Sequence, residues 1–367
     1  MEGFSACFSD LPDPRGPNAM HDLTELLFIA LLATLCGATT CCDFALFART
    51  KEDLLRSVLG LRHGTPSHDT FSRVFRLLDP QAFERSFQRF MGAFAGQMKI
   101  ERAKGVIALD GKALRRAYER GRSHMPPLMV TAWGAHTRMA LANVLAEEGG
   151  EAAAGLRIIE LLKLRDCIVT ADALHCRRDT AEAILAAKGN YVLALKNNQP
   201  RLLAAARNAI AEARRMKDKR SPLHKELSHG RRESRVAFVA AAKTKEASEL
   251  NFPGLKAFAM IRGKRDKDKT VERYYLLSQD HPPARLMEIV RDHWGIENRL
   301  HWTLDVVLDE DGTRNRKDNA PVNLAILRRL ALNIARAHPD KKTSMRGKLK
   351  RAGWDQTFMF DMLVNMR

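Results

Sequence analysis

One segment in the C-terminal third carries polar side chains at helical spacing. The segment HWGIENRLHW spans residues 293–302, and residues four apart in an α-helix lie only about 40° apart around its axis. His293, Glu297 and His301 are therefore predicted to share one face. That face could bind a metal ion, contact nucleic acid or simply be solvated. Trp294 and Trp302 are expected to pack in the core on the other side, with base stacking as the alternative.

Two aspartates follow short apolar runs earlier in the chain. Asp110 ends the run VIAL and Asp172 ends the run CIVTA. An aspartate before glycine is commonly part of a turn. A predicted helical crossover precedes the second run, however, so the two runs can be neighbouring strands, and ligands of open α/β sheets bind outside strand ends. The two carboxylates are therefore candidates for one site, to which Glu297 could add a third.

Carboxylates at such a site would favour a hard divalent cation. Mg²⁺ and Mn²⁺ prefer carboxylate and water oxygens, and two such ions can stabilise both the attacking and the leaving oxygen of a phosphodiester. A zinc site made by His293, Glu297 and His301 is the alternative. No Cys-x-x-Cys spacing accompanies it, and the six cysteines are expected to be reduced and mostly packed.

The charge of the chain points to a polyanionic partner. The 367 residues carry a formal net charge of +18. Their number suggests more than one domain, and a hydrophobic content of 45% is that of a soluble globular protein. Nucleic acid is favoured over a membrane, because the longest apolar run, residues 26–36, is too short to span a bilayer. This run also begins too late, behind Asp22 and Glu25, to resemble a signal peptide. We expect no membrane partner and a cytoplasmic protein.

The periodicity changes along the chain from helical to mixed. Helices are predicted for residues 22–37, 41–60 and 71–78, with Gly37 and Gly60 as C-caps and Ser67 or Asp69 as an N-cap. From residue 106, three apolar runs with short connections predict an antiparallel meander, and runs separated by helices predict a parallel continuation. The resulting fold class is α/β, a mixed sheet flanked by helices and ordered like the ribonuclease-H-like fold.

Residues 201–270 are strongly basic. They contain 19 lysines and arginines against 8 aspartates and glutamates, more than half of the excess charge of the whole chain. Three strand-like runs, at 236–243, 255–262 and 271–279, predict a β-rich insertion that lies along a nucleic-acid backbone. A charged linker is the alternative. A long helix is predicted for residues 284–308 and another for 320–338.

Several polar residues near these elements are candidates for DNA contact, each weighed against an ordinary solvated or structural role. They are Lys112, Lys196, Asn197, Gln199, His229, Arg231, Arg232, Arg291, His293 and His301. The two histidines could contact phosphate or hold the Glu297 carboxylate in place.

Seven stretches together resemble the ISAs1 family of bacterial insertion-sequence transposases, which includes the H-repeat-associated proteins and belongs to the DDE group related to IS4. They are PDPRGPN, GTPSHDTFSRVFRLLD, IALDGKALR, TADALHCRRDTAEAI, YVLALKNNQP, HGRRESR and HWGIENRLHWTLDVVLDEDG. The resemblance extends from about residue 8 to about residue 337. It implies that Asp110, Asp172 and Glu297 are the catalytic, metal-binding triad of a ribonuclease-H-like core that holds two Mg²⁺ or Mn²⁺ ions.

This chain departs from the family pattern at two places. Where the wider IS4 group has Tyr, Arg and Lys around the catalytic Glu, this chain has Val290, His293 and Leu304, so His293 or Arg291 is the candidate substitute. A Lys-Ser-Asn-Glu-like element is expected after the third strand, and here only Glu151 of the stretch EEGGE matches it.

We therefore predict a DDE transposase that cleaves double-stranded element ends and joins the 3′-OH to target DNA. A DNA-assembled homodimer is expected by family analogy. A DNA-binding derivative that does not cut, and a nuclease that cuts without joining, stay open. The expected divisions are a helical N-terminal domain at 1–100, the first part of the catalytic core at 101–200, the basic insertion at 201–280, helices completing the core at 281–340 and a basic C-terminal segment at 341–367.

Overall fold

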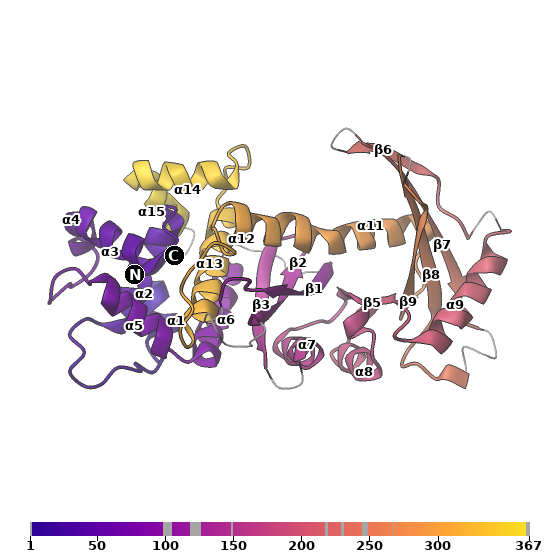
Figure 1. Ribbon diagram of the computed structural model, residues 1–367, viewed down its shortest axis with the longest axis horizontal. Helices are drawn as coiled ribbons and strands as arrows, with labels where there is room; N and C mark the ends of the chain where they lie inside the picture. Colours follow the sequence, from indigo (N-terminus) through magenta and orange to yellow (C-terminus); the bar gives the residue numbers. More distant parts are fainter. Residues whose placement is uncertain are drawn as a thin grey trace.

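The protein is elongated, with helices at one end, a sheet in the middle and further strands at the other end (Figure 1). The computed structural model describes residues 2–97, 105–117, 126–147, 150–216, 219–228, 231–243, 249–266 and 268–364. Both termini lie at the helical end (Figure 1). Among the described residues, no helix is both long and apolar enough to cross a membrane.

The helices cover the sheet and build the helical end of the molecule. In chain order they are α1 (Glu2–Phe8), α2 (Leu23–Leu35), α3 (Cys41–Thr50), α4 (Glu52–Arg56), α5 (His68–Leu77), α6 (Pro80–Gln97), α7 (Gly150–Leu161), the 3₁₀ turn η1 (Ala173–His175), α8 (Arg178–Ala186), α9 (Pro200–Ala213), α11 (Pro283–Gly295), the π-helical turn η2 (Ile296–His301), α12 (Trp302–Val306), α13 (Ala320–Ala337), α14 (Met345–Trp354) and α15 (Gln356–Val364).

Nine strands form one continuous mixed sheet in the order β3-β2-β1-β4-β5-β9-β8-β7-β6. They are β1 (Val106–Ala113), β2 (Leu128–Gly134), β3 (Met139–Ala146), β4 (Ile168–Ala171), β5 (Asn190–Leu195), β6 (His224–Ser228), β7 (Arg231–Ala241), β8 (Ala257–Arg265) and β9 (Val271–Leu277). The first three pair antiparallel, and β4 and β5 continue parallel to β1. This order confirms the predicted ribonuclease-H-like mixed sheet.

The basic segment after β5 extends the same sheet. Strand β9 pairs antiparallel with β5, and β8, β7 and β6 follow outward. Helix α9 packs against β7 and β8 on one side, and α11 returns along the molecule toward β1. The predicted β-structure of this segment is therefore present, and its strands are fixed to the core sheet by backbone hydrogen bonds.

The helical end begins with helices whose starts the sequence encodes. The Asp22 side chain accepts from Glu25 N at the start of α2, and Ser67 accepts from Thr70 N at the start of α5, as predicted. Gly37 has a φ of +93°, a left-handed conformation that fits the predicted C-cap of α2. Because α2 is apolar all round, it lies buried at the centre of this end, where α13 packs against it.

Two predicted helices are interrupted. The single helix expected over residues 41–60 breaks at Lys51 and resumes at Glu52, where two acidic residues favour a new helix N-terminus. The single helix expected over 284–308 widens into the π turn η2 and ends at Val306. The α-helical spacing assumed for His293, Glu297 and His301 is therefore wrong in its second half.

Side chains from two helices cover the β3 edge of the sheet. Among the described strands, β3 pairs with β2 alone, so backbone groups on its outer side need other partners. Asn333 of α13 accepts from Ala140 N at 2.9 Å and donates to Ala140 O at 2.8 Å. Glu84 of α6 accepts from Asn143 N at 2.9 Å. These bonds satisfy the edge and attach the helical end to the sheet.

Glu84 should make the stability of the fold depend on pH. Burial raises the pKa of its carboxyl to about 8, so the folded state holds a proton that the unfolded chain loses above its ordinary pKa. Stability from this proton is present at low pH and is lost as the pH rises through about 8. We expect the unfolding free energy to fall by about 1.4 kcal/mol per pH unit from this group between about pH 5 and pH 8.

Chemical denaturation across that range, on wild type and Glu84→Gln, measures this contribution as the difference between the two slopes. Glu182→Gln, at an exposed position on α8, is the matched control and should parallel wild type. Parallel profiles for wild type and Glu84→Gln would contradict the assignment.

Candidate active site

The two aspartates lie at adjacent strand ends. In the parallel pairing of β1 with β4, Leu109 is opposite Ala171, so Asp110 and Asp172 occupy equivalent next positions. The strands before them are buried on both faces, which explains why their sequences are continuous apolar runs. Asp172 leaves the sheet as the N-cap of η1, where its side chain accepts from Leu174 N at 2.8 Å. The predicted pair of carboxylates is therefore brought together.

Glu297 reaches the same region from the π turn η2, which lies against β1. The backbone N–H of Trp302 donates to Glu297 O, five residues earlier, and this wider turn changes the direction of the side chains that follow. Such turns inside α-helices are frequent at functional sites. Glu297 is exposed, so its carboxylate is open to a ligand.

The carboxylates are close enough to influence one another. The pKa of Asp110 is raised to about 7, first by burial and then by the negative charges of Glu297, Glu151 and Asp172. Loss of hydration near the surrounding protein also raises the pKa of Glu297, and the positive charge of Arg273 opposes this shift. Three other carboxylates therefore lie close enough to Asp110 to disfavour its ionisation.

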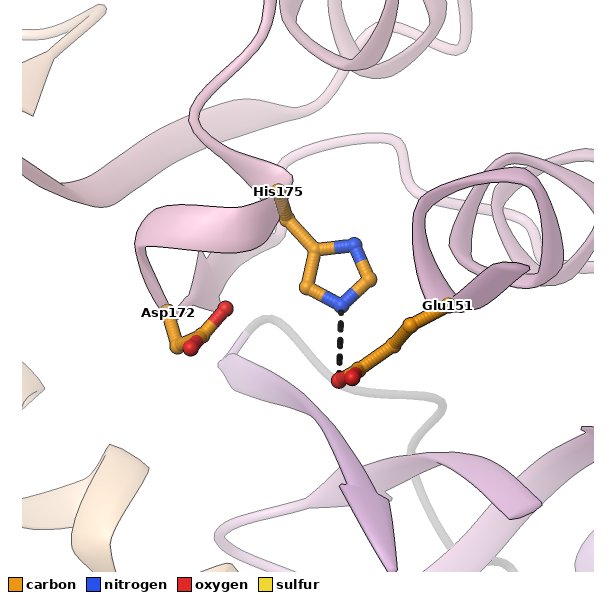
Figure 2. Close-up of side chains that lie close together, drawn as sticks. All are labelled: Glu151, Asp172 and His175. Atoms are coloured by element: carbon orange, nitrogen blue, oxygen red, sulfur yellow. Dashed lines mark ion pairs between the residues drawn. The ribbon is translucent and has the colours of Figure 1, made fainter. Parts of the chain in front are cut away.

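The most compact group of metal-ligating side chains includes only one member of the predicted triad. Among the described residues, one set of three has its ligand atoms all within 4.8 Å of one another, and it consists of Glu151, Asp172 and His175. Figure 2 shows Glu151 reaching from α7 toward His175 of η1 and Asp172, the N-cap of that turn. His175 Nε2 lies 3.5 Å from Glu151 Oε1.

The two histidines of the opening motif are partly buried and neutral. His293 Nδ1 lies 3.0 Å from Thr170 Oγ1 on β4, and burial lowers the pKa of its imidazole to about 4. His301 Nδ1 lies 3.7 Å from Asp110 Oδ2, and burial, with Arg329 and Lys112 nearby, lowers its pKa to about 3. Both side chains therefore contact the strands that carry the aspartates, and neither offers a positive charge to phosphate.

Lys112 is not at the surface. Its side chain is 8% exposed, and its ammonium lies 2.7 Å from Asp305 Oδ1 and 2.8 Å from Asp311 Oδ1. Glu310, fully buried, lies 3.4 Å away and pairs with the guanidinium of Arg329 at 2.7 Å. Because its charge is already satisfied by three carboxylates, the predicted contact of Lys112 with DNA has no support in this geometry.

Four of the other predicted DNA contacts lie in the loop after β5 or on α11. Lys196 and Asn197 are exposed and line a cavity of about 600 Å³ together with Asp172. Gln199 instead donates to Cys176 O at 3.0 Å and ties its loop to η1. Arg291 donates to Glu226 at 3.1 Å, with the His224 ring nitrogen 2.9 Å away.

Two further candidates, Arg231 and Arg232, lie at the start of β7. Arg232 is exposed, and its backbone N–H donates to Asp266 at 2.8 Å. The backbone of Arg231 belongs to β7 and pairs with Ser228. His229 lies outside the described residues.

A groove of about 650 Å³ leads to Glu297. It runs between α11 and the sheet of the basic insertion. Seven of its lining residues are basic and four are acidic, so its walls favour an anion. The basic ones are Arg235, Lys264, Arg265, Lys269, Arg273, Arg291 and Arg299.

The two tryptophans of the motif differ from one another. Trp294 is half-buried against the core, with the Arg273 guanidinium 5.3 Å from its ring centre. Trp302 is 56% exposed, so the prediction that it packs in the core is wrong. The π turn that precedes Trp302 changes the face from which it projects.

Two models of known protein families match the chain. Residues 101–334 match the model described as Transposase DDE domain, and residues 5–91 match the model described as DDE_Tnp_1-associated. The chain belongs to the DDE transposase family. The predicted family is therefore confirmed, and with it the prediction that the protein is a transposase enzyme.

Two relatives from bacteria cover most of the chain. The H repeat-associated protein YhhI of Escherichia coli strain K12 is 30% identical over 97% of this chain and 96% of its own length. A protein encoded in the dhlA 3′ region of Xanthobacter autotrophicus is 36% identical over 71% of this chain and 88% of its own length. A cryo-EM structure of a piggyBac transposase synaptic complex with hairpin DNA aligns with 98% of this chain and 77% of its own, at 13% identity and a TM-score of 0.41, a likeness too low to support an inference.

Two residues of this cluster, Glu151 and His175, lie outside the predicted triad. In the sequence, Glu151 stands out only as the one match to a family element, and His175 follows Asp172 by three positions. The spacing Asp-x-x-His after a predicted strand was the available signal. The partner across the site could not be found in the same way, because Glu151 reaches it through the packing of α7.

The buried charges around Lys112 give a direct test of this part of the structure. Lys112→Met keeps the aliphatic stem but leaves Asp305 and Asp311 without their shared cation, and removing one partner of a buried ion pair costs about 3–5 kcal/mol. Urea denaturation should show this loss of unfolding free energy. Lys196→Met, at an exposed lysine, is the matched control and should change stability by less than about 0.5 kcal/mol. Equal stabilities for the two variants would contradict the burial of Lys112.

Proposed function

We propose that this transposase cleaves the double-stranded ends of its own insertion sequence and joins the freed 3′-OH to target DNA. The observation that carries the proposal is the convergence of Asp110, Asp172 and Glu297 on one end of a ribonuclease-H-like sheet. The family match supports the chemistry class.

The donor set suits a divalent cation. Its members are carboxylates, which Mg²⁺ and Mn²⁺ prefer, and their mutual repulsion would be relieved by positive charge between them. Asp110, Asp172 and Glu297 would hold two Mg²⁺ or Mn²⁺ ions, which supply Lewis-acid stabilisation of the charge that develops on the phosphodiester oxygens.

The protein's own residues position the reacting groups. In the first step, a water oxygen forms a bond to phosphorus and the bond from phosphorus to the 3′-oxygen of the element end breaks, so that oxygen leaves as the free hydroxyl. In the second step, this 3′-OH attacks a target phosphodiester and displaces the target's own 3′-oxygen. The rigid strands hold the aspartates in place for both steps, and catalysis of this kind depends mainly on position and charge.

DNA binding is assigned to two surfaces. The groove between α11 and the basic insertion leads to Glu297 and would hold one strand of the element end by its phosphates. The helical domain at residues 1–100 would contact DNA on the other side of the site. Since transposition joins two ends, a homodimer assembled on DNA is the proposed working form.

The first test is a gel assay of cleavage and joining with Mg²⁺ or Mn²⁺ on a duplex taken from the flank of the gene. Asp110→Asn and Glu297→Gln should lower the cleavage rate by about a hundredfold or more, because each removes charge stabilisation at the reacting phosphate. Asp166→Asn is the matched control, since it is an exposed aspartate just before β4, and it should cleave like wild type.

Three results are informative. Nicking and joining that both substitutions abolish, with DNA binding retained, support the transposase. Nicking without joined products in wild type favours a nuclease. Binding without any cleavage favours a DNA-binding derivative and overturns the proposal.

The groove makes a second prediction, concerning salt. Lys264 and Lys269 are exposed in its wall, and replacing both by alanine should weaken binding to any duplex sequence about equally. The slope of log affinity against log salt concentration should become shallower by about 1 for each DNA phosphate that the protein no longer neutralises. Fluorescence anisotropy at several salt concentrations measures the slope. Lys163→Ala, at an exposed lysine that does not line the groove, should leave it unchanged, and an equal effect of both variants would rule the groove out.

A further inference from the structure

We infer that Glu151 is a fourth carboxylate ligand of the divalent-cation site and that His175 holds it in position. The inference rests on the proposed function, because it concerns the same site as Asp172. Glu151 lies on α7, a helix that carries none of the three residues of the proposed catalytic triad.

The surrounding backbone places Glu151 and leaves room for its side chain. It lies in the first turn of α7, and an oxygen of its carboxylate lies within 4.8 Å of an oxygen of Asp172. A Cβ at Gly111, next to Asp110 on β1, would lie 2.5 Å from Glu151 Oε1. Glycine at that position therefore leaves the space that lets the carboxylate approach β1 beside the first aspartate.

His175 provides an independent observation that points to a ligand here. Its side chain is completely buried, and neither ring nitrogen has a hydrogen-bond partner among the described residues. Burying an imidazole whose nitrogens have no hydrogen-bond partner lowers the free energy of unfolding, so a functional role is expected for it. Its Nε2 faces Glu151 Oε1 at 3.5 Å, as Figure 2 shows.

The backbone also makes room for the imidazole ring. Gly155 lies one helical turn after Glu151, and a Cβ there would lie 2.6 Å from the His175 ring. The same face of α7 therefore presents the carboxylate and accepts the ring. Replacing a residue that contacts a metal ligand and orients it commonly lowers metal affinity by about 10–100-fold.

The close approach of the Glu151 and Asp172 carboxylates favours a cation between them. Glu151 is 17% exposed, and among the described residues no lysine or arginine forms an ion pair with it or with Asp172. Two carboxylates this close, without a protein cation between them, repel each other. A hard divalent cation bound by both is the arrangement that removes the repulsion.

The test is a Mn²⁺ titration of the full-length protein without DNA, in which the electron paramagnetic resonance signal of free Mn²⁺ reports binding. Glu151→Gln should bind Mn²⁺ at least about tenfold more weakly than wild type. Glu160→Gln is the matched control, because it is an exposed glutamate on the same helix, and it should bind like wild type. Asp172→Asn, tested in parallel, reports on the proposed function itself.

These variants separate the two claims. If Asp172→Asn weakens binding and Glu151→Gln does not, the fourth ligand is wrong and the proposed function stands. If neither variant changes Mn²⁺ affinity, the carboxylate site itself is wrong. Weaker binding in both variants supports the fourth ligand.

The role of His175 is tested by His175→Phe, which keeps a ring over Gly155 but cannot donate to Glu151. It should bind Mn²⁺ about tenfold more weakly while its thermal unfolding temperature stays the same or rises, since the ring no longer buries unpaired nitrogens. The double variant with Glu151→Gln should bind no more weakly than Glu151→Gln alone. Effects that add in the double variant would show that His175 acts independently of Glu151, and would overturn the positioning role.

Discussion

Repulsion between carboxylates at the ends of β1 and β4 is the constraint on which the rest of the structure depends. Burial first, and then the negative charges of Glu297, Glu151 and Asp172, raise the pKa of Asp110 to about 7. A flexible chain would let these carboxylates separate. Here the parallel register fixes two of them, because both follow strands that are buried on both faces. The packing of α7 and η2 against β2 and β1 brings the other two to the same place. The fold therefore maintains a charge distribution that a bound cation would stabilise.

The continuous sheet gives this site a fixed relation to its basic surroundings. Strand β9 pairs directly with β5, so the insertion cannot turn freely relative to the core. Helix α11 packs against both β7 of the insertion and β1 of the core, and it leads straight into the turn that carries Glu297. The groove beside it therefore ends at a carboxylate of the site. A substrate strand bound by its phosphates in that groove would be delivered in one orientation.

The elements were predictable where local pattern determines them. VIAL and CIVTA read as buried parallel strands because burial on both faces requires continuous apolar runs, and the crossover between them implies neighbouring positions. The π turn was not predictable, because one extra residue in a helical turn is favoured by contacts that the sequence pattern does not contain. The burial of Lys112 is not predictable for a related reason. The sequence alone suggests that a lysine two residues after Asp110 is exposed, but residues 305–311 pack over it.

The ion pairs of Lys112 affect the negative charge of the proposed metal site. Two residues apart on one strand, Lys112 and Asp110 project on the same face, so the ammonium could have neutralised the carboxylate. Asp305, Glu310 and Asp311 bind it instead, and burial keeps His301 neutral beside Asp110. Among the described residues, no lysine or arginine then forms an ion pair with Asp110 or Asp172. The acidic residues that follow the motif thus act on the site indirectly, by holding a lysine that would otherwise compete with a cation.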